Sequence, residues 1–290
     1  MLLRIDKMKV CYGEQVALNI TQPISVMEGD RIGVIGSNGA GKSTLIRSLM
    51  GLKKYEGHVE TNLKSGDMAV QMQFNNYPEG VSCKVIMERI IGERIEENPQ
   101  AENLIRYFDF EDCLRKRYSK LSGGQKQRFT VILVMLQEAP ITFYDEVTSG
   151  LDFETRNNLM VKLNEWYGER KDALLIVSHY YEELESLANK LLILDKGRVV
   201  DFGEKETLFH RYCGRSVIVL ENSPQNRKLL EKEHLLVAPD RYLAISPQTE
   251  AEELILIQRL LQTNVSFRRS KCDIELLYIN AKENGKRGDY

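Results

Sequence analysis

The stretch Gly36-Ser-Asn-Gly-Ala-Gly-Lys-Ser-Thr44 decides the fold. It follows Arg31-Ile-Gly-Val-Ile35, an apolar run that predicts a buried strand, and it leads into Lys42 to Met50, where apolar residues recur at helical spacing. In a strand, glycine loop and helix in this order, backbone N–H groups and the positive helix end converge on phosphate oxygens. The sequence therefore predicts a nucleotide phosphate site in an α/β domain with a parallel sheet.

Each residue type in this loop suits that chemistry. The glycines allow the backbone to approach phosphate closely, Lys42 would neutralise phosphate charge, and the Ser43 hydroxyl would coordinate Mg²⁺. A glycine turn with an incidental lysine is the alternative, and the preceding apolar strand argues against it. The residues predicted to bind the nucleotide here are Gly36, Ser37, Asn38, Gly39, Ala40, Gly41, Lys42, Ser43 and Thr44.

Two adjacent carboxylates follow a second apolar run. Asp145 ends Ile141-Thr-Phe-Tyr144, so its carboxylate should emerge beside the glycine loop and hold Mg²⁺ directly or through water. Glu146 comes next and points elsewhere, where it can take a proton from an attacking water. A solvated loop is the alternative for an Asp-Glu pair. The pattern indicates phosphoryl hydrolysis, with Glu146 as general base and Asp145 as metal ligand.

Between these segments stands Leu121-Ser-Gly-Gly-Gln-Lys-Gln-Arg128. Ser122, Gly123 and Gly124 begin a predicted helix, and so they offer a hydroxyl, backbone N–H groups and a dipole end to a γ-phosphate. A plain helix cap would not need so long a pattern. In this order, the three motifs resemble those of the ATP-binding subunits of ABC transporters, and the resemblance covers roughly Ile5 to Tyr212. It implies the α/β fold of a P-loop NTPase, with an antiparallel β subdomain and an α-helical insertion.

The resemblance implies further roles. ATP and Mg²⁺ would be the ligands, with His179 orienting the water, Gln73 touching Mg²⁺ and water, and Tyr12 stacking on adenine. Gln71 competes with Gln73 for its role, and Val147 departs from the family's usual proline. Signature residues of one subunit would close over ATP held by another. The residues expected at that second ATP are Leu121, Ser122, Gly123, Gly124 and Gln125, with Asp152 in the loop that follows Glu146.

The same resemblance implies partners. Two copies would pack head to tail; a homodimer is the simplest assembly, and a heterodimer is the alternative. A separate multi-span membrane subunit would carry the cargo, and this chain would sit peripherally on the cytoplasmic face of the cell membrane. The helical insertion, about residues 74–138, would transmit motion to that partner through a docking surface on Phe74 to Glu88.

Composition excludes other classes. With 290 residues, 42% hydrophobic, 28% charged and a formal charge of −2, the chain lacks the basic surplus expected of a nucleic-acid-binding protein. Its five scattered cysteines form no Cys-x-x-Cys pair, which argues against structural zinc or a disulfide framework. The start lacks a signal-like apolar region, and Phe129 to Gln137 is much shorter than the ~20 residues needed to span a bilayer.

The pattern changes after Tyr212. We expect an ATPase domain over 1–212 and an accessory α+β domain over 213–290, the latter in the strand-helix-strand-strand-helix-strand order of a ferredoxin-like fold. Its ending resembles that of ABC-2-type exporter ATPases, which favours export of a peptide or drug. Lys282 to Tyr290 is expected to be a frayed tail. A soluble ABC-type ATPase acting on ribosomes or DNA is the alternative function.

Overall fold

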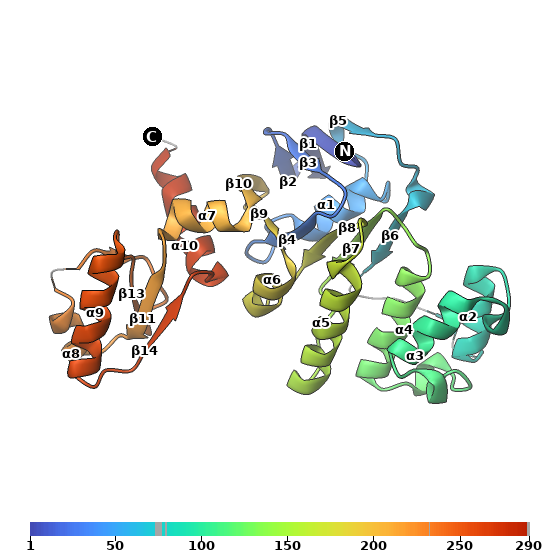
Figure 1. Cartoon of the computed structure of the whole chain (residues 1–290). Coiled ribbons are helices and arrows are strands. Elements are labelled where there is room, and N and C mark those ends of the chain that lie inside the picture. Colours follow the sequence, from blue (N-terminus) through green and yellow to red (C-terminus); the bar gives the residue numbers. More distant parts are fainter. Residues whose placement is uncertain (73–76, 79, 232, 289–290) are drawn as a thin grey trace.

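The structure is a computed structural model that describes residues 1–72, 77–78, 80–231 and 233–288. Figure 1 shows a central sheet with its helices, a helical insertion in green on one side, and a C-terminal unit in orange and red on the other. The predicted α/β architecture, with a helical insertion and a separate antiparallel sheet, is confirmed.

The central sheet mixes a parallel core with an antiparallel flank. Its strands are β1 Leu3–Tyr12, β2 Gln15–Ile20, β3 Ile24–Val26, β4 Arg31–Ile35, β5 Glu56–Thr61, β6 Met68–Gln71, β7 Ile141–Asp145, β8 Ala173–Val177, β9 Lys190–Asp195 and β10 Arg198–Glu204. Their order is β3-β1-β2-β10-β9-β4-β8-β7-β6, and β5 pairs with β1. From β9 to β6 neighbouring strands run parallel. β7 and β8 are buried along their whole length, as their apolar sequences predict.

Helices cover this sheet and build the insertion. Those of the core are α1 Lys42–Leu49, α5 Phe153–Gly168, α6 Tyr181–Leu187 and α7 Lys205–Cys213, and those of the insertion are α2 Cys83–Ile91, α3 Pro99–Tyr107 and α4 Gly123–Met135. Short 3₁₀ turns are η1 Ser65–Asp67, η2 Ile95–Glu97, η3 Glu111–Cys113 and η4 Tyr118–Lys120. Phe108, Phe110 and Phe129 are fully buried where the insertion packs. These aromatic residues explain why a segment of short helices holds together.

The C-terminal unit has the predicted ferredoxin-like topology. Its elements are β11 Val217–Glu221, α8 Pro224–Leu229, β12 Leu235–Leu236, β13 Tyr242–Ile245, α9 Glu250–Gln262 and β14 Phe267–Ser270. The sheet order is β12-β13-β11-β14 and every neighbouring pair is antiparallel. Each helix therefore connects two parallel strands that have a third strand between them, which is the split βαβ arrangement.

The expected frayed tail is wrong for most of its length. Residues from Ile274 to Gly288 form helix α10, which packs on α7, α6 and β10 of the central domain. The Lys282 ammonium lies 3.1 Å from the Asp195 carboxylate at the end of β9. Burial of Ile274, Leu277 and Ala281 against the core stabilises this helix despite its charged end. Because α10 crosses back over the predicted boundary at 212–213, that boundary stays a prediction.

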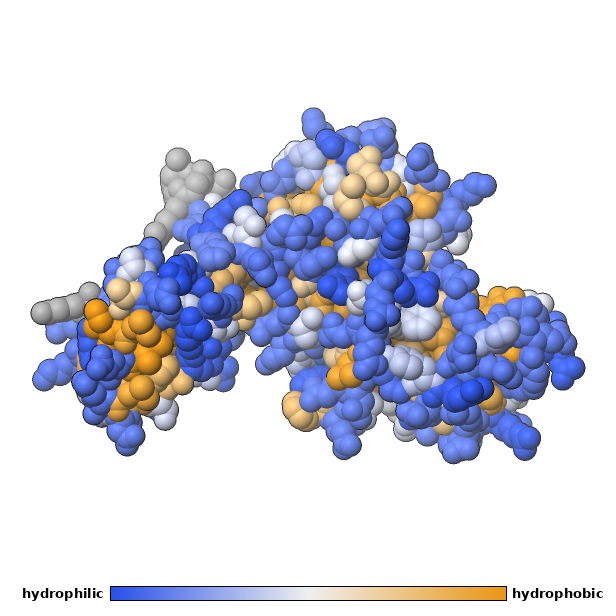
Figure 2. Space-filling model, in the orientation of Figure 1, coloured by the Kyte–Doolittle hydropathy of each residue, from blue (hydrophilic) through white to orange (hydrophobic). Residues whose placement is uncertain are grey.

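Exposed apolar residues gather on the C-terminal unit. Figure 2 shows an orange patch over α9, where Leu254, Ile255 and Leu261 are more than half exposed. Within the described part of the chain, no helix combines the length and the apolar character that a membrane crossing requires.

Candidate functional site

Neighbouring parallel strands bring the predicted site together. β8 pairs with β4 on one side and with β7 on the other, all in parallel register. Their carboxyl ends therefore meet at one edge of the sheet, where ligands bind in open α/β folds. The glycine loop follows β4, Glu146 follows β7, and His179 follows β8 after one residue. Segments far apart in sequence thus share one edge.

Two loop glycines are required by their surroundings. A Cβ at Gly36 would lie 2.5 Å from the carbonyl oxygen of Leu194, so this turn can pack against β9 only without a side chain. Gly41 has φ +101°, and a Cβ there would lie 2.9 Å from the Ala17 carbonyl oxygen. Helix α1 starts at Lys42, immediately after this turn and with no side-chain cap, so its first backbone N–H groups are available to a bound anion.

A cavity of about 660 Å³ opens over this loop. It is large enough for a nucleotide, and its lining includes a cation and a carboxylate from other segments. The lining residues are Tyr12, Gln15, Val16, Ala17, Asn38, Gly39, Ala40, Gly41, Lys42, Ser43, Thr44, Glu146 and Lys196. Sequence reasoning missed Gln15, Val16, Ala17 and Lys196. The Lys196-Gly197 turn between two apolar strands was the one available signal for the last of these.

Tyr12 lies at the mouth of this cavity. Tyr12 is 43% exposed, and the Lys53 ammonium lies 3.9 Å from the centroid of its ring. A hydrogen bond with Thr44 lowers the pKa of the Tyr12 hydroxyl. The aromatic face available for stacking is therefore the one that Lys53 does not cover, and the stacking role of Tyr12 stays a prediction.

Lys42 is almost buried at the centre of the loop. Its Nζ donates to the carbonyl oxygens of Gly36 at 2.7 Å and Ser37 at 3.2 Å. Burial lowers the pKa of Lys42, while the nearby Glu146 and Asp145 carboxylates act in the opposite direction. A cation confined this way stands ready for phosphate, which would replace the carbonyl contacts with a stronger, charge-assisted one.

Asp145 and Ser43 fit a magnesium ion. Asp145 is 2% exposed, and among the described residues its Oδ1 has no hydrogen-bond partner. Burial raises the pKa of this carboxyl, against a hydrogen bond from the Ser43 side chain that lowers it. An orphaned buried carboxylate oxygen beside a hydroxyl is a pair of hard oxygen donors that a divalent cation would satisfy.

Glu146 and His179 meet across two strand ends. His179 Nε2 lies 2.8 Å from Glu146 Oε1, within hydrogen-bond distance. Glu146 has φ +58°, uncommon for a residue with a side chain, and its N–H donates to the Val177 carbonyl oxygen at 3.0 Å. Strained backbone of this kind persists where the surrounding structure holds it.

The signature segment forms a capped helix start outside this cavity. Ser122 Oγ accepts from the Gln125 N–H at 3.3 Å, and the Gln125 side chain accepts from the Ser122 N–H at 3.1 Å, a reciprocal capping box. Leu121 is buried beneath it. Of the described residues that line the cavity, none belongs to Leu121–Gln125. The chain therefore does not bring its own signature segment to its own glycine loop.

Of the remaining predicted residues, Asp152 and Gln71 are described by the structure and Gln73 is not. Asp152 caps α5, since its side chain accepts from the N–H and the hydroxyl of Thr155 at 3.0 and 2.7 Å. Gln71 is fully buried at the end of β6, and its amide donates to Gln127 at 3.0 Å. Gln73 lies outside the described residues, so its predicted role is untested.

The predicted docking stretch, Phe74 to Glu88, is described only in part. Phe74, Asn75, Asn76 and Glu79 lie outside the described residues. Tyr77 is half-buried, and its ring packs edge-on against Tyr118 and Phe129, with centroids 4.8 and 5.2 Å apart. Because it packs inward, Tyr77 is a weaker candidate for direct contact with a partner than the sequence indicated.

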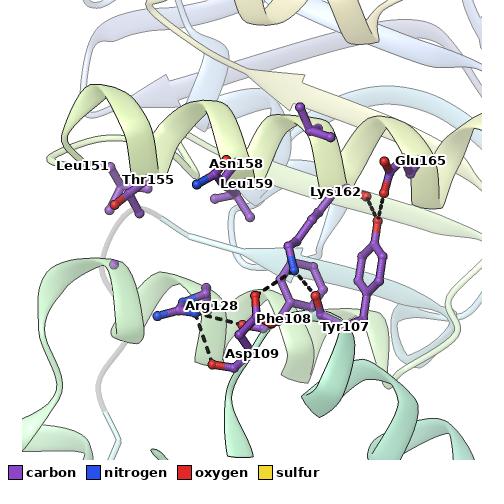
Figure 3. Close-up of a pocket in the computed structure, with 12 residues that line it drawn as sticks. Tyr107, Phe108, Asp109, Arg128, Leu151, Thr155, Asn158, Leu159, Lys162 and Glu165 are labelled. Atoms are coloured by element: carbon purple, nitrogen blue, oxygen red, sulfur yellow. Dashed lines mark hydrogen bonds and ion pairs between the residues drawn. The ribbon is translucent and has the colours of Figure 1, made fainter.

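A groove of about 500 Å³ separates α5 from the insertion (Figure 3). Lys162 on α5 reaches across it to the Tyr107 carbonyl oxygen and to Asp109 Oδ2, the latter at 3.0 Å. From α4, Arg128 donates to the Phe108 and Asp109 carbonyl oxygens at 3.0 and 3.2 Å. The turn after α3 is thus held by both helices, which ties the signature helix to the core.

Comparisons with known proteins agree with this geometry. A family model described as "ABC transporter" matches residues 22–149. The energy-coupling factor transporter ATP-binding protein EcfA1 of Ligilactobacillus salivarius is 30% identical over 228 residues, covering 72% of this chain and 79% of its own length. The methionine import ATP-binding protein MetN of Clostridium tetani is 27% identical over 285 residues, covering 90% and 85%.

Two further matches are a relative named for resistance and a solved structure. A linearmycin resistance ATP-binding protein, LnrL of Bacillus subtilis, is 25% identical over 243 residues, covering 79% of this chain and 78% of its own length. The solved structure of an ATP-binding subunit of an ABC transporter is 22% identical, with a TM-score of 0.66 over 80% of this chain and 99% of that one. That structural match supports the fold alone.

The chain belongs to the ABC transporter family of ATP-binding subunits. It is accordingly an ATPase that binds ATP with Mg²⁺.

Proposed function

We propose that this chain is the motor subunit of a membrane transporter, hydrolysing ATP at the edge where β4, β7 and β8 end. The observation that carries the proposal is the 2.8 Å contact between His179 and Glu146 beside the glycine loop. A carboxylate held by an imidazole next to a phosphate cradle suits a base that activates water. The family membership supports the same chemistry.

In this proposal each residue has a distinct task. The glycine loop and Lys42 hold the phosphates, while Ser43 and Asp145 hold Mg²⁺, which supplies charge neutralisation when bound. Glu146 receives the proton of the attacking water, and His179 keeps that carboxylate and the water aligned. Asp145 and Glu146 can differ in role because Asp145 is buried beside Ser43, whereas Glu146 lines the cavity and contacts His179.

The signature segment supports a head-to-tail dimer. Ser122, Gly123 and Gly124 open a capped helix whose start does not line the chain's own cavity. A helix N-terminus is a favourable place for the γ-phosphate of a second ATP. Two copies would then sandwich two ATP molecules, and the helical insertion would carry their closure to a separate membrane subunit. The chain would act peripherally at the cytoplasmic face of the membrane.

Transport direction is a separate part of the proposal. The relative named for methionine import covers 90% of the chain, and the relative named for linearmycin resistance covers 79%. The names therefore favour import over the export predicted from the C-terminal ending. No observation favours action on ribosomes or DNA. Two assays on cells that lack this gene test the direction. A loss of uptake of a candidate substrate would indicate import, and a loss of efflux of that substrate from preloaded cells would indicate export.

Trapping of an ATP-bound dimer tests the motor proposal. Glu146→Gln should reduce ATP turnover at least 100-fold while ATP binding stays within about threefold of the wild type, because the phosphate cradle is intact. ATP with Mg²⁺ should then shift the variant from monomer to dimer in sedimentation. Glu169→Gln, an exposed change at the far end of α5, is the matched control and should behave as the wild type. Normal turnover by Glu146→Gln would refute the assigned base.

A further inference from the structure

A second glutamate, Glu183, is buried four residues after His179. It belongs to the first turn of α6 and is 5% exposed. Buried carboxylates are rare unless they are paired or hydrogen-bonded. Ser178 Oγ donates to Glu183 Oε2 at 2.6 Å, and the same hydroxyl accepts from the Tyr180 N–H at 2.9 Å. The Glu183 carboxylate therefore holds Ser178 directly, and it holds Tyr180 through the Ser178 hydroxyl.

The other side of this carboxylate faces two more segments. Arg156 on α5 places its Nε 3.8 Å from Glu183 Oε1, and its guanidinium lies 3.9 Å from the centroid of the Tyr180 ring. Burial raises the pKa of Glu183, while hydrogen bonds from Ser178 and Thr148 lower it. Thr148 stands two residues after Glu146 and is itself buried. Glu183 thus contacts the chain after Glu146, the loop that carries His179, and the helix capped by Asp152.

These contacts exceed what helix capping requires. The backbone N–H of α6 could be satisfied by water at a surface, and Glu182 in the same turn is exposed. Glu183 instead places its charge inward, between segments that each carry a residue of the proposed site. A buried carboxylate that holds the Ser178 hydroxyl, which in turn accepts from the Tyr180 N–H, restricts where the imidazole between them can go.

We propose that Glu183 is a positioning residue for hydrolysis, holding the 178–180 loop so that His179 stays against Glu146. The proposal rests on the proposed function of Glu146 and His179, and it adds a buried residue that is not among those lining the nucleotide cavity. Through its ion pair with Arg156, the same carboxylate also holds this loop against α5. Loss of the carboxylate should therefore misplace the imidazole without disturbing the phosphate loop.

The test compares steady-state ATP hydrolysis by full-length variants. Glu183→Ala should lower kcat at least tenfold with KM for ATP unchanged within twofold, because small displacements of catalytic groups are costly while the cradle is untouched. Ser178→Ala, which removes the bridging hydroxyl, should show the same pattern and serves if Glu183→Ala does not fold. Glu182→Gln is the matched control on the same helix turn and should keep the wild-type kcat.

A double variant separates positioning from general destabilisation. In a His179→Ala background, Glu183→Ala should lower kcat by no more than about twofold, because its effect runs through the imidazole already removed. An equal loss in both backgrounds, or wild-type kcat for folded Glu183→Ala and Ser178→Ala, would overturn the proposal. If Glu146→Gln hydrolyses ATP normally, the proposed function fails. That result is distinguishable from failure of the Glu183 proposal, in which Glu146→Gln is still inactive.

Discussion

Gly124 on the signature helix sits directly against α5, and the substitution Gly124→Ala tests that contact. A Cβ at Gly124 would lie 2.9 Å from Thr155 Cγ2, closer than real Cβ atoms approach other atoms. Thr155 cannot turn away freely, because its hydroxyl donates to Asp152 Oδ2 at 2.7 Å. The added methyl should therefore push the start of α4 away from α5.

The structure sets the expected magnitude. Overpacking of this kind costs about 1–3 kcal/mol, and replacing glycine by alanine in a helix gains up to about 1 kcal/mol. Gly124→Ala alone should then lower the free energy of unfolding by about 0–2 kcal/mol. In a Thr155→Ser background the nearest remaining Thr155 side-chain atoms, Oγ1 and Cβ, stand 3.8 and 3.9 Å away, so the clash disappears while the hydroxyl for Asp152 stays. The coupling between the two substitutions should therefore be about 1–3 kcal/mol.

Urea unfolding of the wild type, both single variants and the double variant measures this coupling. Thr155→Ser alone is the control for loss of the methyl group. If Gly124→Ala costs the same in both backgrounds, the clash with Thr155 is not its cause and the reasoning is refuted. ATP hydrolysis adds a second readout: a double variant that regains stability but stays inactive would place Gly124 against the nucleotide of a second subunit.

Two other predictions concern ion pairs. Lys162→Met keeps the aliphatic stem but removes the hydrogen-bond donors to Tyr107 and Asp109. Backbone amide exchange across residues 107–110, measured by mass spectrometry, should therefore accelerate about tenfold or more. Unchanged exchange would mean that packing alone holds the two sides of the groove together. The Arg269 guanidinium holds the pKa of Glu253 at about 2, below its usual 4.5. The ion pair therefore stabilises the C-terminal unit fully at pH values above 4.5, and this stabilisation is lost as the pH falls from 4.5 towards 2. Glu253→Gln should flatten the acid dependence of unfolding across that window, and an unchanged profile would contradict the assignment.

Much of the fold follows from local sequence patterns. The strand, glycine loop and helix from Arg31 to Leu49 are specified by residues that contact one another, as are the elements of the ferredoxin-like unit. The charges from Lys282 onward predict a solvated tail, whereas these residues continue a helix that begins at Ile274. The signal was available, since Ile274, Leu277, Tyr278 and Ala281 recur at helical spacing. The local pattern does not show which surface this helix covers, because that surface is built by α6 and α7 from an earlier part of the chain.

Side-chain roles at the site were less accessible to sequence reasoning. Three glutamates stand within four residues on α6, and only tertiary packing decides that Glu183 faces inward while Glu182 faces solvent. The inward packing of Tyr77 is likewise set by Tyr118 and Phe129, which lie far along the chain. Long-range contacts of this kind leave no local period in the sequence.

The return of α10 to the central domain has a consequence for synthesis of the protein on the ribosome. The apolar surface of α7, including Leu208 and Phe209, is completed by a helix that begins at Ile274, some 60 residues later in the chain. Until that helix emerges, the ATPase core carries an uncovered apolar face, which is where nascent chains aggregate or recruit chaperones. The last step in folding of the core therefore waits for the C-terminal unit, although every residue of the proposed catalytic site has been made long before.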